Sequence, residues 1–270
     1  MMNDTHLIAF GAPYDMFQNA HHRFTNNVNQ INFFKSINIF SEKNIFEYCT
    51  DIQKHKDFLG GKGYGYWIWK YYLVSELMKN TPKNDIIFYI DIGCSFNWSA
   101  VSRMEEYCDI ASEKGSLCFY PLNNEFIERG TPYLEKYKVD TPHPYYSFYN
   151  PEFLWTKADT YYRIFSDDKH YDTPQTAATL FFLKNNEKNQ EIIEEIKKIM
   201  FEKNYHYITD APSQIPNPQY FRDHRHDQSV FSLISKKYNL HTIPDETYHY
   251  PNWGIWGKDY PIWAIRNKFG

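Results

Sequence analysis

The stretch NDIIFYIDIGC, residues 84–94, decides the fold. A run of isoleucines and aromatic residues between polar turn residues predicts a strand that is buried on both faces. The strand ends at Asp91, and Gly93 follows two residues later. In an open α/β sheet, ligands bind outside the carboxyl ends of the strands. We therefore predict that Asp91 reaches a bound metal ion or a ligand hydroxyl, and that Gly93 lets the backbone come close to the ligand.

Composition narrows the class of protein. The chain has 270 residues, of which 42% are hydrophobic and 19% aromatic, and its net charge is -4. This length and hydrophobic content predict a folded α/β protein with a substantial core. The negative charge argues against a nucleic-acid partner. The many Tyr and Trp side chains suit stacking on sugar or nucleotide rings, although the codon bias of an AT-rich genome would explain them equally well.

Cysteine usage and hydropathy indicate the compartment. The four cysteines are scattered and form no CxxC pair, which argues against a zinc ribbon or a disulfide framework and fits a reducing cytoplasm. The N-terminus lacks the features of a signal peptide, and no apolar run is long enough to span a bilayer. We expect a cytoplasmic protein that associates at most peripherally with the inner face of the cell membrane.

Strand and helix patterns alternate along the chain. Strands are expected at residues 5–11, 37–40, within 84–94, 116–122, 175–184 and 239–244. Helices are expected at residues 24–36, 67–78, 97–114, 155–165, 186–203 and 228–238, with 46–59 helical in part. Asn97 is the expected N-cap of its helix, and residues 123–150 read as a long surface loop. This alternation predicts a mainly parallel central sheet with helices on both faces, in a single domain that spans residues 1–270.

A glycine-rich segment, GGKGYGYWIWK at residues 60–70, precedes the central strand. It predicts a flexible loop that leads into a helix N-terminus, where unpaired N–H groups and the helix dipole favour an anion. Gly63, Tyr64 and Gly65 would line this site, and Lys70 would add positive charge, although a solvated helix lysine is the alternative. The spacing matches neither a Walker A motif nor a Rossmann fingerprint.

A polar segment, RDHRHDQ at residues 222–228, leads into the last long helix. Asp227 has two explanations, as the N-cap of that helix or as a residue that contacts a ligand. His224 and His226 are two residues apart and do not face one way on a helix, so a zinc pair is not expected. Gln175, at the start of the strand expected at 175–184, is a further candidate to face the site.

Three of these stretches together resemble bacterial glycosyltransferases of the GT-A fold, a Rossmann-like class that uses nucleotide sugars. Asp91-Ile92-Gly93 is similar to a degenerate form of the Asp-x-Asp element of that class, with glycine in place of the second acid. Residues 63–70 look like a block found in uncharacterised members from surface-polysaccharide gene clusters. Residues 224–229 look like the Asp-Gln pair of glycogenin-like enzymes, which contacts the donor sugar. In the tail, His249 and Lys258 are similar in order to the glycogenin-like C-terminal motif.

The resemblance implies sugar transfer from a nucleotide-sugar donor to a glycan or lipid-linked glycan acceptor, in capsule or lipopolysaccharide synthesis. The part up to about residue 122 would bind the nucleotide, and the remainder would serve the acceptor side. The implied donor-binding residues are Asp91, Gly93, Lys70, Gly63, Tyr64, Gly65 and Lys258. The implied catalytic residues are Asp227 and Gln228, and the implied sugar or acceptor contacts are His224, Arg225, His226 and Gln175.

The resemblance also implies a divalent metal ion. Mn²⁺ or Mg²⁺ would be held by Asp91 and His249, and either ion would neutralise the charge that develops on the leaving diphosphate. Retaining and inverting chemistry both stay open. Two other classes of protein also stay open: another metal-dependent nucleotide-handling enzyme on a Rossmann-like sheet, and a non-catalytic carbohydrate-binding protein.

Overall fold

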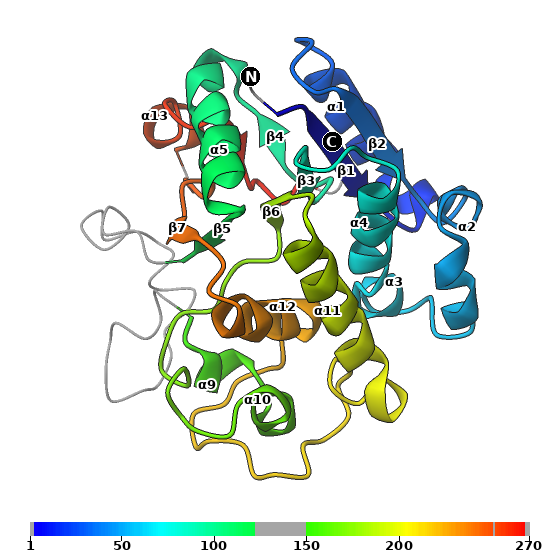
Figure 1. Ribbon diagram of the computed structural model, residues 1–270, viewed down its shortest axis with the longest axis vertical. Coiled ribbons are helices and arrows are strands. Elements are labelled where there is room, and N and C mark those ends of the chain that lie inside the picture. The colour runs from blue at the N-terminus through cyan, green and yellow to red at the C-terminus, as the bar shows by residue number, and fades with distance from the viewer. Residues whose placement is uncertain (1–2, 122–149, 251, 268–270) are drawn as a thin grey trace. The chain divides into compact units, whose positions relative to one another are not determined.

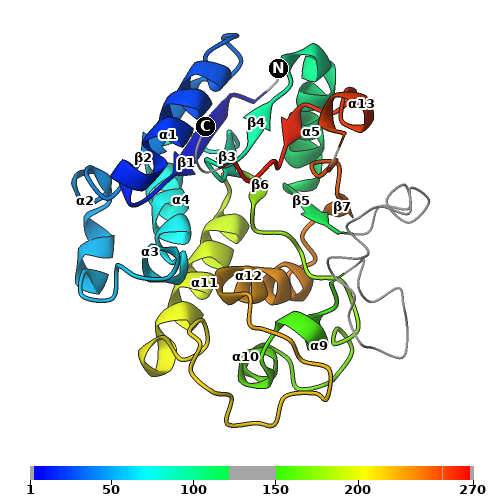
Figure 2. The same ribbon diagram turned by 180° about the vertical axis from the view of Figure 1, so that it is seen from behind.

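The computed structural model describes residues 3–121, 150–250 and 252–267, so the expected loop at 123–150 lies outside the described residues except at its last position. Its main sheet has six strands in the order β2-β1-β3-β6-β5-β7 (Figure 1; Figure 2 shows it from behind). These strands are β1 (Thr5–Phe10), β2 (Ser36–Phe40), β3 (Ile86–Ile90), β5 (Ser116–Tyr120), β6 (Leu180–Lys184) and β7 (Thr242–Pro244). The pairs β1–β2, β1–β3 and β5–β7 are parallel, whereas β6 is antiparallel to both of its neighbours. The predicted, mainly parallel sheet is confirmed.

Helices connect most of the strands. They are α1 (Tyr14–Val28), α2 (Ile45–Tyr48), η1 (Thr50–His55), α3 (Gly63–Tyr66), α4 (Trp69–Lys79), η2 (Trp98–Ala100), α5 (Val101–Lys114), α9 (Glu152–Trp155), α10 (Ala158–Ile164), α11 (Glu187–Tyr205), α12 (His226–Lys237) and α13 (Trp253–Trp256). A second, two-stranded sheet pairs β4 (Ser95–Phe96) with β8 (Ile262–Trp263). No helix among the described residues is both long enough and apolar enough to cross a membrane.

The chain forms two compact units, which are described one at a time. Unit 1 consists of Met1–Leu117, Thr179–Glu194 and Glu246–Gly270, and unit 2 consists of Cys118–Ala178 and Glu195–Asp245. Neither unit is one continuous stretch of sequence, because the chain leaves unit 1 after β5 begins and returns to it for β6 and for the tail. A functional division near residue 122 stays a prediction.

The core of unit 1 is built on the alternation of side chains along its strands. Every residue of β3 is fully buried, as the run of isoleucines and aromatic residues predicts. In β6, the adjacent residues Phe181 and Phe182 point to opposite faces. Phe181 stacks on Tyr71 of α4 at 6.3 Å, and Phe182 contacts Tyr107 of α5 at 5.9 Å. Helices therefore cover both faces of the sheet, as expected.

Two predicted elements are wrong in their bounds. The helix expected at 24–36 is α1, which begins at Tyr14 and ends at Val28. Its apolar stripe includes Ala20 and Phe24, but the polar residues around them hide its beginning in the sequence. The strand expected at 175–184 begins only at Leu180, because Gln175 and Thr176 belong to unit 2, where they bond to Thr156 and Ser232.

Asn97 occupies the N-cap position of η2, which leads into α5, but its side chain makes no capping hydrogen bond. Its side-chain amide donates to the carbonyls of Lys258 at 2.8 Å and Tyr260 at 3.1 Å, and its backbone N–H donates to Pro261. The residue thus fastens the C-terminal tail beside β4, which pairs with β8 of the same tail. A contact this distant in the sequence outcompetes the local cap.

Candidate functional site

Asp91 lies directly after β3, where the prediction places it. Its backbone N–H donates to the carbonyl of Thr179, and its carbonyl accepts the N–H of Cys94, both typical of a tight turn at a strand end. The side chain is 38% exposed, although every residue of β3 before it is buried. The turn therefore presents a carboxylate to solvent at the carboxyl end of the sheet.

One oxygen of Asp91 is engaged by two neighbours. The hydroxyl of Tyr89 donates to Oδ1 at 2.5 Å, and the ammonium of Lys70 lies 3.8 Å from the same oxygen. The Lys70 side chain is only 3% exposed, and its Nζ lies 4.9 Å from the centre of the Tyr89 ring, a cation–π distance. Within the described residues, no hydrogen bond or ion pair reaches Oδ2. Oδ2 can therefore accept a hydrogen bond from a ligand.

Tyr89 was not among the predicted site residues. Its signal was nevertheless present, since residues two apart in a strand point to the same side and Asp91 follows at that spacing. The contact between Asp91 and Lys70 confirms only that the two are neighbours; their roles in donor binding stay predictions.

The glycine-rich segment forms a left-handed turn. Five consecutive residues have positive φ: Gly63 (60°), Tyr64 (50°), Gly65 (84°), Tyr66 (52°) and Trp67 (63°). For residues other than glycine this conformation costs about 1–2 kcal/mol each, so two glycines among five limit the strain. Backbone strain of this kind persists where surrounding structure enforces it, often at functional sites.

The N–H groups of this segment are already used. Those of Gly65, Tyr66 and Trp67 donate to carbonyls at residues 60, 62 and 63. The expected loop with unpaired N–H groups ready for an anion is therefore wrong for these positions. The turn instead places the side chain of Tyr64 beside Phe10, at the carboxyl end of β1.

Aromatic side chains gather beside the carboxyl end of β1. Trp69 stacks on Phe10 at 4.0 Å, and its indole N–H donates to the carbonyl of Gly63 at 3.0 Å. The ring of Tyr64 lies 5.8 Å from that of Phe10. Burial, with a smaller contribution from the charge of Glu42, raises the pKa of Tyr64, so its hydroxyl stays protonated and can donate. Phe10 and Trp69 are buried, at 3% and 4% exposure, so of these rings only that of Tyr64 is partly open to a flat ligand ring.

Gly93 has a neighbour from the chain itself. A Cβ on Gly93 would lie 3.4 Å from Cα of Arg266, and the N–H of Asn267 donates to the carbonyl of Gly93 at 3.1 Å. The backbone that approaches here is thus the C-terminal tail. Approach of a ligand to Gly93 stays a prediction.

The tail residues predicted to hold the metal and the diphosphate differ in exposure. His249 is fully buried, lies parallel to the ring of Tyr260 at 5.0 Å, and has Nε2 3.0 Å from the carbonyl of Glu246. A role of His249 as a metal ligand stays a prediction, and its ring packs inside the tail. Lys258 is 68% exposed, with Asp259 4.0 Å away, and its contact with a diphosphate stays a prediction.

The residues around Asp91 do not fit a protein-held metal ion. No group of three or more His, Cys, Asp or Glu side chains suited to a metal occurs in the described part of the chain. Glycine stands where the second acid would be, and the Lys70 ammonium lies 3.8 Å from the one acid present. At an effective dielectric constant of about 20, a divalent ion about 6 Å from an ammonium is repelled by about 5 kcal/mol.

In unit 2, Gln175 is a structural residue. Its side chain is fully buried, and its amide donates to Thr156 at 2.9 Å and to Ser229 at 3.2 Å. The amide of Gln228 in turn donates to the side-chain oxygen of Gln175 at 2.9 Å. The expected sugar contact of Gln175 is therefore wrong, since no face of the side chain reaches solvent. Asp227 is 5% exposed in the first turn of α12, and the catalytic roles of Asp227 and Gln228 stay predictions.

His224 and His226 hold a neighbouring segment of unit 2. Each is 4% exposed. Nε2 of His224 lies 2.8 Å from the carbonyl of Tyr207, and Nδ1 of His226 lies 2.7 Å from that of Ile208. Burial, aided by the charge of Lys157, lowers the pKa of His224 well below its usual value, so the neutral ring donates to Tyr207. The expected sugar contacts of both histidines are wrong.

Arg225 lies between these histidines in sequence but not in environment. Its guanidinium is 3.9 Å from the centre of the Trp155 ring and donates to the side chain of Asn150 at 3.1 Å. These contacts hold it within unit 2, and an acceptor contact stays a prediction.

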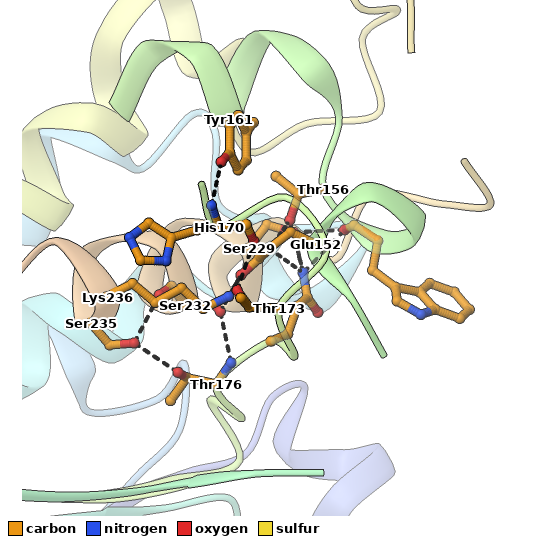
Figure 3. Close-up of polar contacts among 12 residues, drawn as sticks. Glu152, Thr156, Tyr161, His170, Thr173, Thr176, Ser229, Ser232, Ser235 and Lys236 are labelled. Atoms are coloured by element: carbon orange, nitrogen blue, oxygen red, sulfur yellow. Dashed lines mark hydrogen bonds and ion pairs between the residues drawn. The ribbon is translucent and has the colours of Figure 1, made fainter. Parts of the chain in front are cut away.

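Among the described residues of unit 2, the most buried carboxylate is Glu152, which is 0% exposed. Figure 3 shows it among its polar partners. Its Oε1 accepts from Ser232 and from Lys236, both at 2.5 Å, and its Oε2 accepts from Thr156 at 2.5 Å. Burial lowers the pKa of Lys236, and the Glu152 charge opposes that shift. Both oxygens are satisfied, so this cluster stabilises the unit and leaves no oxygen for a ligand.

No protein-family model and no curated protein matches the chain. Among solved structures, the apo form of mouse xyloside xylosyltransferase 1 is similar, with 9% sequence identity and a TM-score of 0.46 over 99% of this chain and 99% of that chain. A likeness at this level transfers no residue roles, so activity has to be argued from the site itself.

Proposed function

We propose that this protein is a glycosyltransferase that takes a sugar from a nucleotide-sugar donor. The observation that carries the proposal is the carboxylate of Asp91, half-exposed at the carboxyl end of a fully buried strand, with one oxygen held by Tyr89 and the other open. Ligands of open α/β sheets bind at such strand ends. An exposed acid with one oxygen fixed is suited to accept hydroxyl groups of a ribose or a hexose.

Lys70 and Tyr64 complete the donor site in this proposal. When the bond from the anomeric carbon to the diphosphate oxygen breaks, the electron pair leaves with the diphosphate. The acceptor hydroxyl oxygen bonds to that carbon and releases its proton to a carboxylate base or to the departing diphosphate. Lys70 places a positive charge within 3.8 Å of Asp91, where it stabilises the leaving anion. Tyr64, whose ring lies 5.8 Å from that of the buried Phe10, offers a partly exposed ring to the base or the sugar.

The acceptor and the location are further parts of the proposal. The resemblance of residues 63–70 to members from surface-polysaccharide clusters supports a growing surface glycan, of capsule or lipopolysaccharide type, as the acceptor. All four cysteines are buried thiols outside disulfides, which supports a cytoplasmic location at the inner membrane face. Asp227 and Gln228 are the proposed catalytic pair, by the same resemblance.

A binding panel tests the proposal. UDP-glucose, UDP-galactose, UDP-N-acetylglucosamine, GDP-mannose and CMP-sialic acid are added to the protein with Mn²⁺, with Mg²⁺ or with EDTA, and the melting temperature is measured. At least one donor should raise it, since a ligand bound only to the folded state stabilises that state. Asp91→Asn should reduce the shift sharply. Glu187→Gln, which removes a carboxylate from the exposed pair with Lys83, is the control and should leave the shift intact.

The outcomes separate the rival classes. If no donor shifts the melting temperature under any metal condition, the proposal is wrong. If a donor binds but no acceptor elicits nucleotide release, the protein is a nucleotide- or sugar-binding protein without transferase activity. A requirement for Mn²⁺ or Mg²⁺ would show that phosphate oxygens of the donor complete a metal site that the described residues do not build.

A further inference from the structure

Arg23 lies on α1, and its guanidinium reaches away from that helix to the turn that follows Asp91. It donates to the carbonyl of Ile92 at 3.1 Å and to the carbonyl of Cys94 at 2.9 Å. It also donates to the hydroxyl of Ser95 at 2.7 Å. One side chain therefore holds three of the four residues that follow Asp91.

The same guanidinium also holds the C-terminal tail. Arg23 donates to the carbonyl of Asn267 at 2.9 Å, while the N–H of Asn267 donates to the carbonyl of Gly93 at 3.1 Å. The tail is joined to this region a second time, where Ile262 of β8 pairs with Phe96 of β4. The Asp91 turn and the tail are thus bonded to each other and to one shared arginine.

The partners of Arg23 are unusual for an arginine. Within the described residues no carboxylate contacts it, and its four hydrogen bonds go to three carbonyls and one hydroxyl. Its Nε is buried and has no hydrogen-bond partner in the structure. Burying part of a guanidinium without a counter-charge costs free energy, which indicates that the converging carbonyls are what this side chain is placed to recognise.

We propose that Arg23 is a positioning residue that locks the Asp91 turn to the C-terminal tail, so that Asp91 keeps its orientation toward a nucleotide-sugar donor. The effect of Arg23 on donor binding rests on the proposed function. The hydrogen bonds by which Arg23 joins the turn to the tail do not depend on that function. The carboxylate of Asp91 is partly exposed and is held through one oxygen only. The direction in which the other oxygen points therefore depends on the backbone of the turn.

The first experiment needs no ligand. Backbone hydrogen exchange is measured by NMR for Arg23→Met, Arg23→Lys and the wild type. In Arg23→Met, the N–H groups of Cys94 and Asn267 should exchange at least about tenfold faster than in the wild type, because local opening then costs less. The N–H groups inside β3 should be unchanged. Arg23→Lys keeps the charge and part of the donor set, and should lie between the two.

The second experiment tests the link to Asp91. Affinities for UDP-glucose and GDP-mannose, or for whichever donor of the panel binds, are measured for Arg23→Met, Asp91→Asn and the double variant. Arg23→Met should weaken binding by about tenfold in the wild-type background and hardly at all beside Asp91→Asn, since residues that act through one another are not additive. Arg163→Met, which removes a guanidinium bonded to Glu202 in unit 2, is the matched control and should bind as the wild type.

Each outcome decides the proposal. If exchange at Cys94 and Asn267 is unchanged, or if both Arg23 variants speed exchange uniformly through unit 1, Arg23 is no specific lock and the proposal is overturned. If exchange changes locally but donor affinity falls equally in both backgrounds, the lock does not act through Asp91. If the wild type binds no donor at all, the proposed function fails, while the exchange measurement still judges the lock.

Discussion

Two lysine–carboxylate pairs in this protein have similar side chains but differ in exposure and in hydrogen bonding. In unit 1, Asp91 is 38% exposed, lies 3.8 Å from Lys70 and has one oxygen without a protein partner among the described residues. In unit 2, Glu152 is 0% exposed, lies 2.5 Å from Lys236 and has both oxygens engaged. Asp91 therefore has an oxygen that can accept a hydrogen bond from a ligand, whereas both oxygens of Glu152 are already bonded within unit 2.

The two pairs differ in which carboxylate has lost its water and in how fully hydrogen bonds and a counter-charge replace that water. A buried ion is tolerated only when hydrogen bonds and a counter-charge replace its water. Glu152 meets this condition with Ser232, Thr156 and Lys236. Asp91 keeps part of its water and exchanges it for a ligand at little cost. A polar group in the sequence is therefore a candidate for function only when the fold leaves it incompletely satisfied.

The largest effect is expected at Glu152. Glu152→Gln leaves the Lys236 ammonium buried without its counter-charge, and should lower the free energy of unfolding by about 3–5 kcal/mol. Urea unfolding measures this change. The matched control is Glu187→Gln in the exposed pair with Lys83, which should unfold as the wild type does. If the two variants are equally stable, the buried Glu152–Lys236 pair does not stabilise the fold more than an exposed pair does.

Lys70→Met tests the other pair. It should weaken donor binding by about tenfold or more, because the positive charge beside the diphosphate is lost. The same change removes the repulsion that opposes a divalent ion at Asp91, so Mn²⁺ should strengthen donor binding more in the variant than in the wild type. Calorimetric titration with and without Mn²⁺ checks both effects. If donor affinity is unchanged both with and without Mn²⁺, Lys70 has a structural role only and takes no part in donor binding.

The pH dependence of stability tests the structural assignment of His224. Burial lowers its pKa in the folded state, so between the unfolded value near 6.5 and the lower folded value the unfolded chain binds more protons. Stability should therefore fall as the pH drops below about 6.5, by at most about 1.4 kcal/mol per pH unit for this one group. His224→Gln should flatten the slope of the unfolding free energy against pH. The exposed His22→Gln is the control, and an unchanged slope in both variants would contradict the assignment.

The smallest effect on stability is expected at Gly93. A methyl group there would meet Cα of Arg266 at 3.4 Å, an ordinary van der Waals distance. Gly93→Ala should thus change the free energy of unfolding by less than about 1 kcal/mol. If a ligand approaches this backbone as predicted, donor affinity should still fall. A variant that binds donors normally would assign Gly93 to packing against the tail.

Local sequence was sufficient for the central strand and for the exposed carboxylate at its end. The run from Ile86 to Ile90 has no polar residue to place on a wet face, so it had to be buried, and Asp91 had to leave the core. The sheet class followed from the alternation of strands and helices. Helix α1 was misplaced because its apolar residues are few and widely separated among polar ones.

Tertiary structure alone decided which polar residues are open to a ligand. His224, His226 and Gln175 look as suited to binding in the sequence as Asp91 does, but carbonyls and side chains distant in the chain satisfy them inside unit 2. Arg23 and Asn267 are unremarkable in the sequence and meet at the Asp91 turn only in the fold. Burial and hydrogen-bond satisfaction depend on contacts between distant segments, whereas strand formation and a carboxylate at a strand end depend on neighbours along the chain.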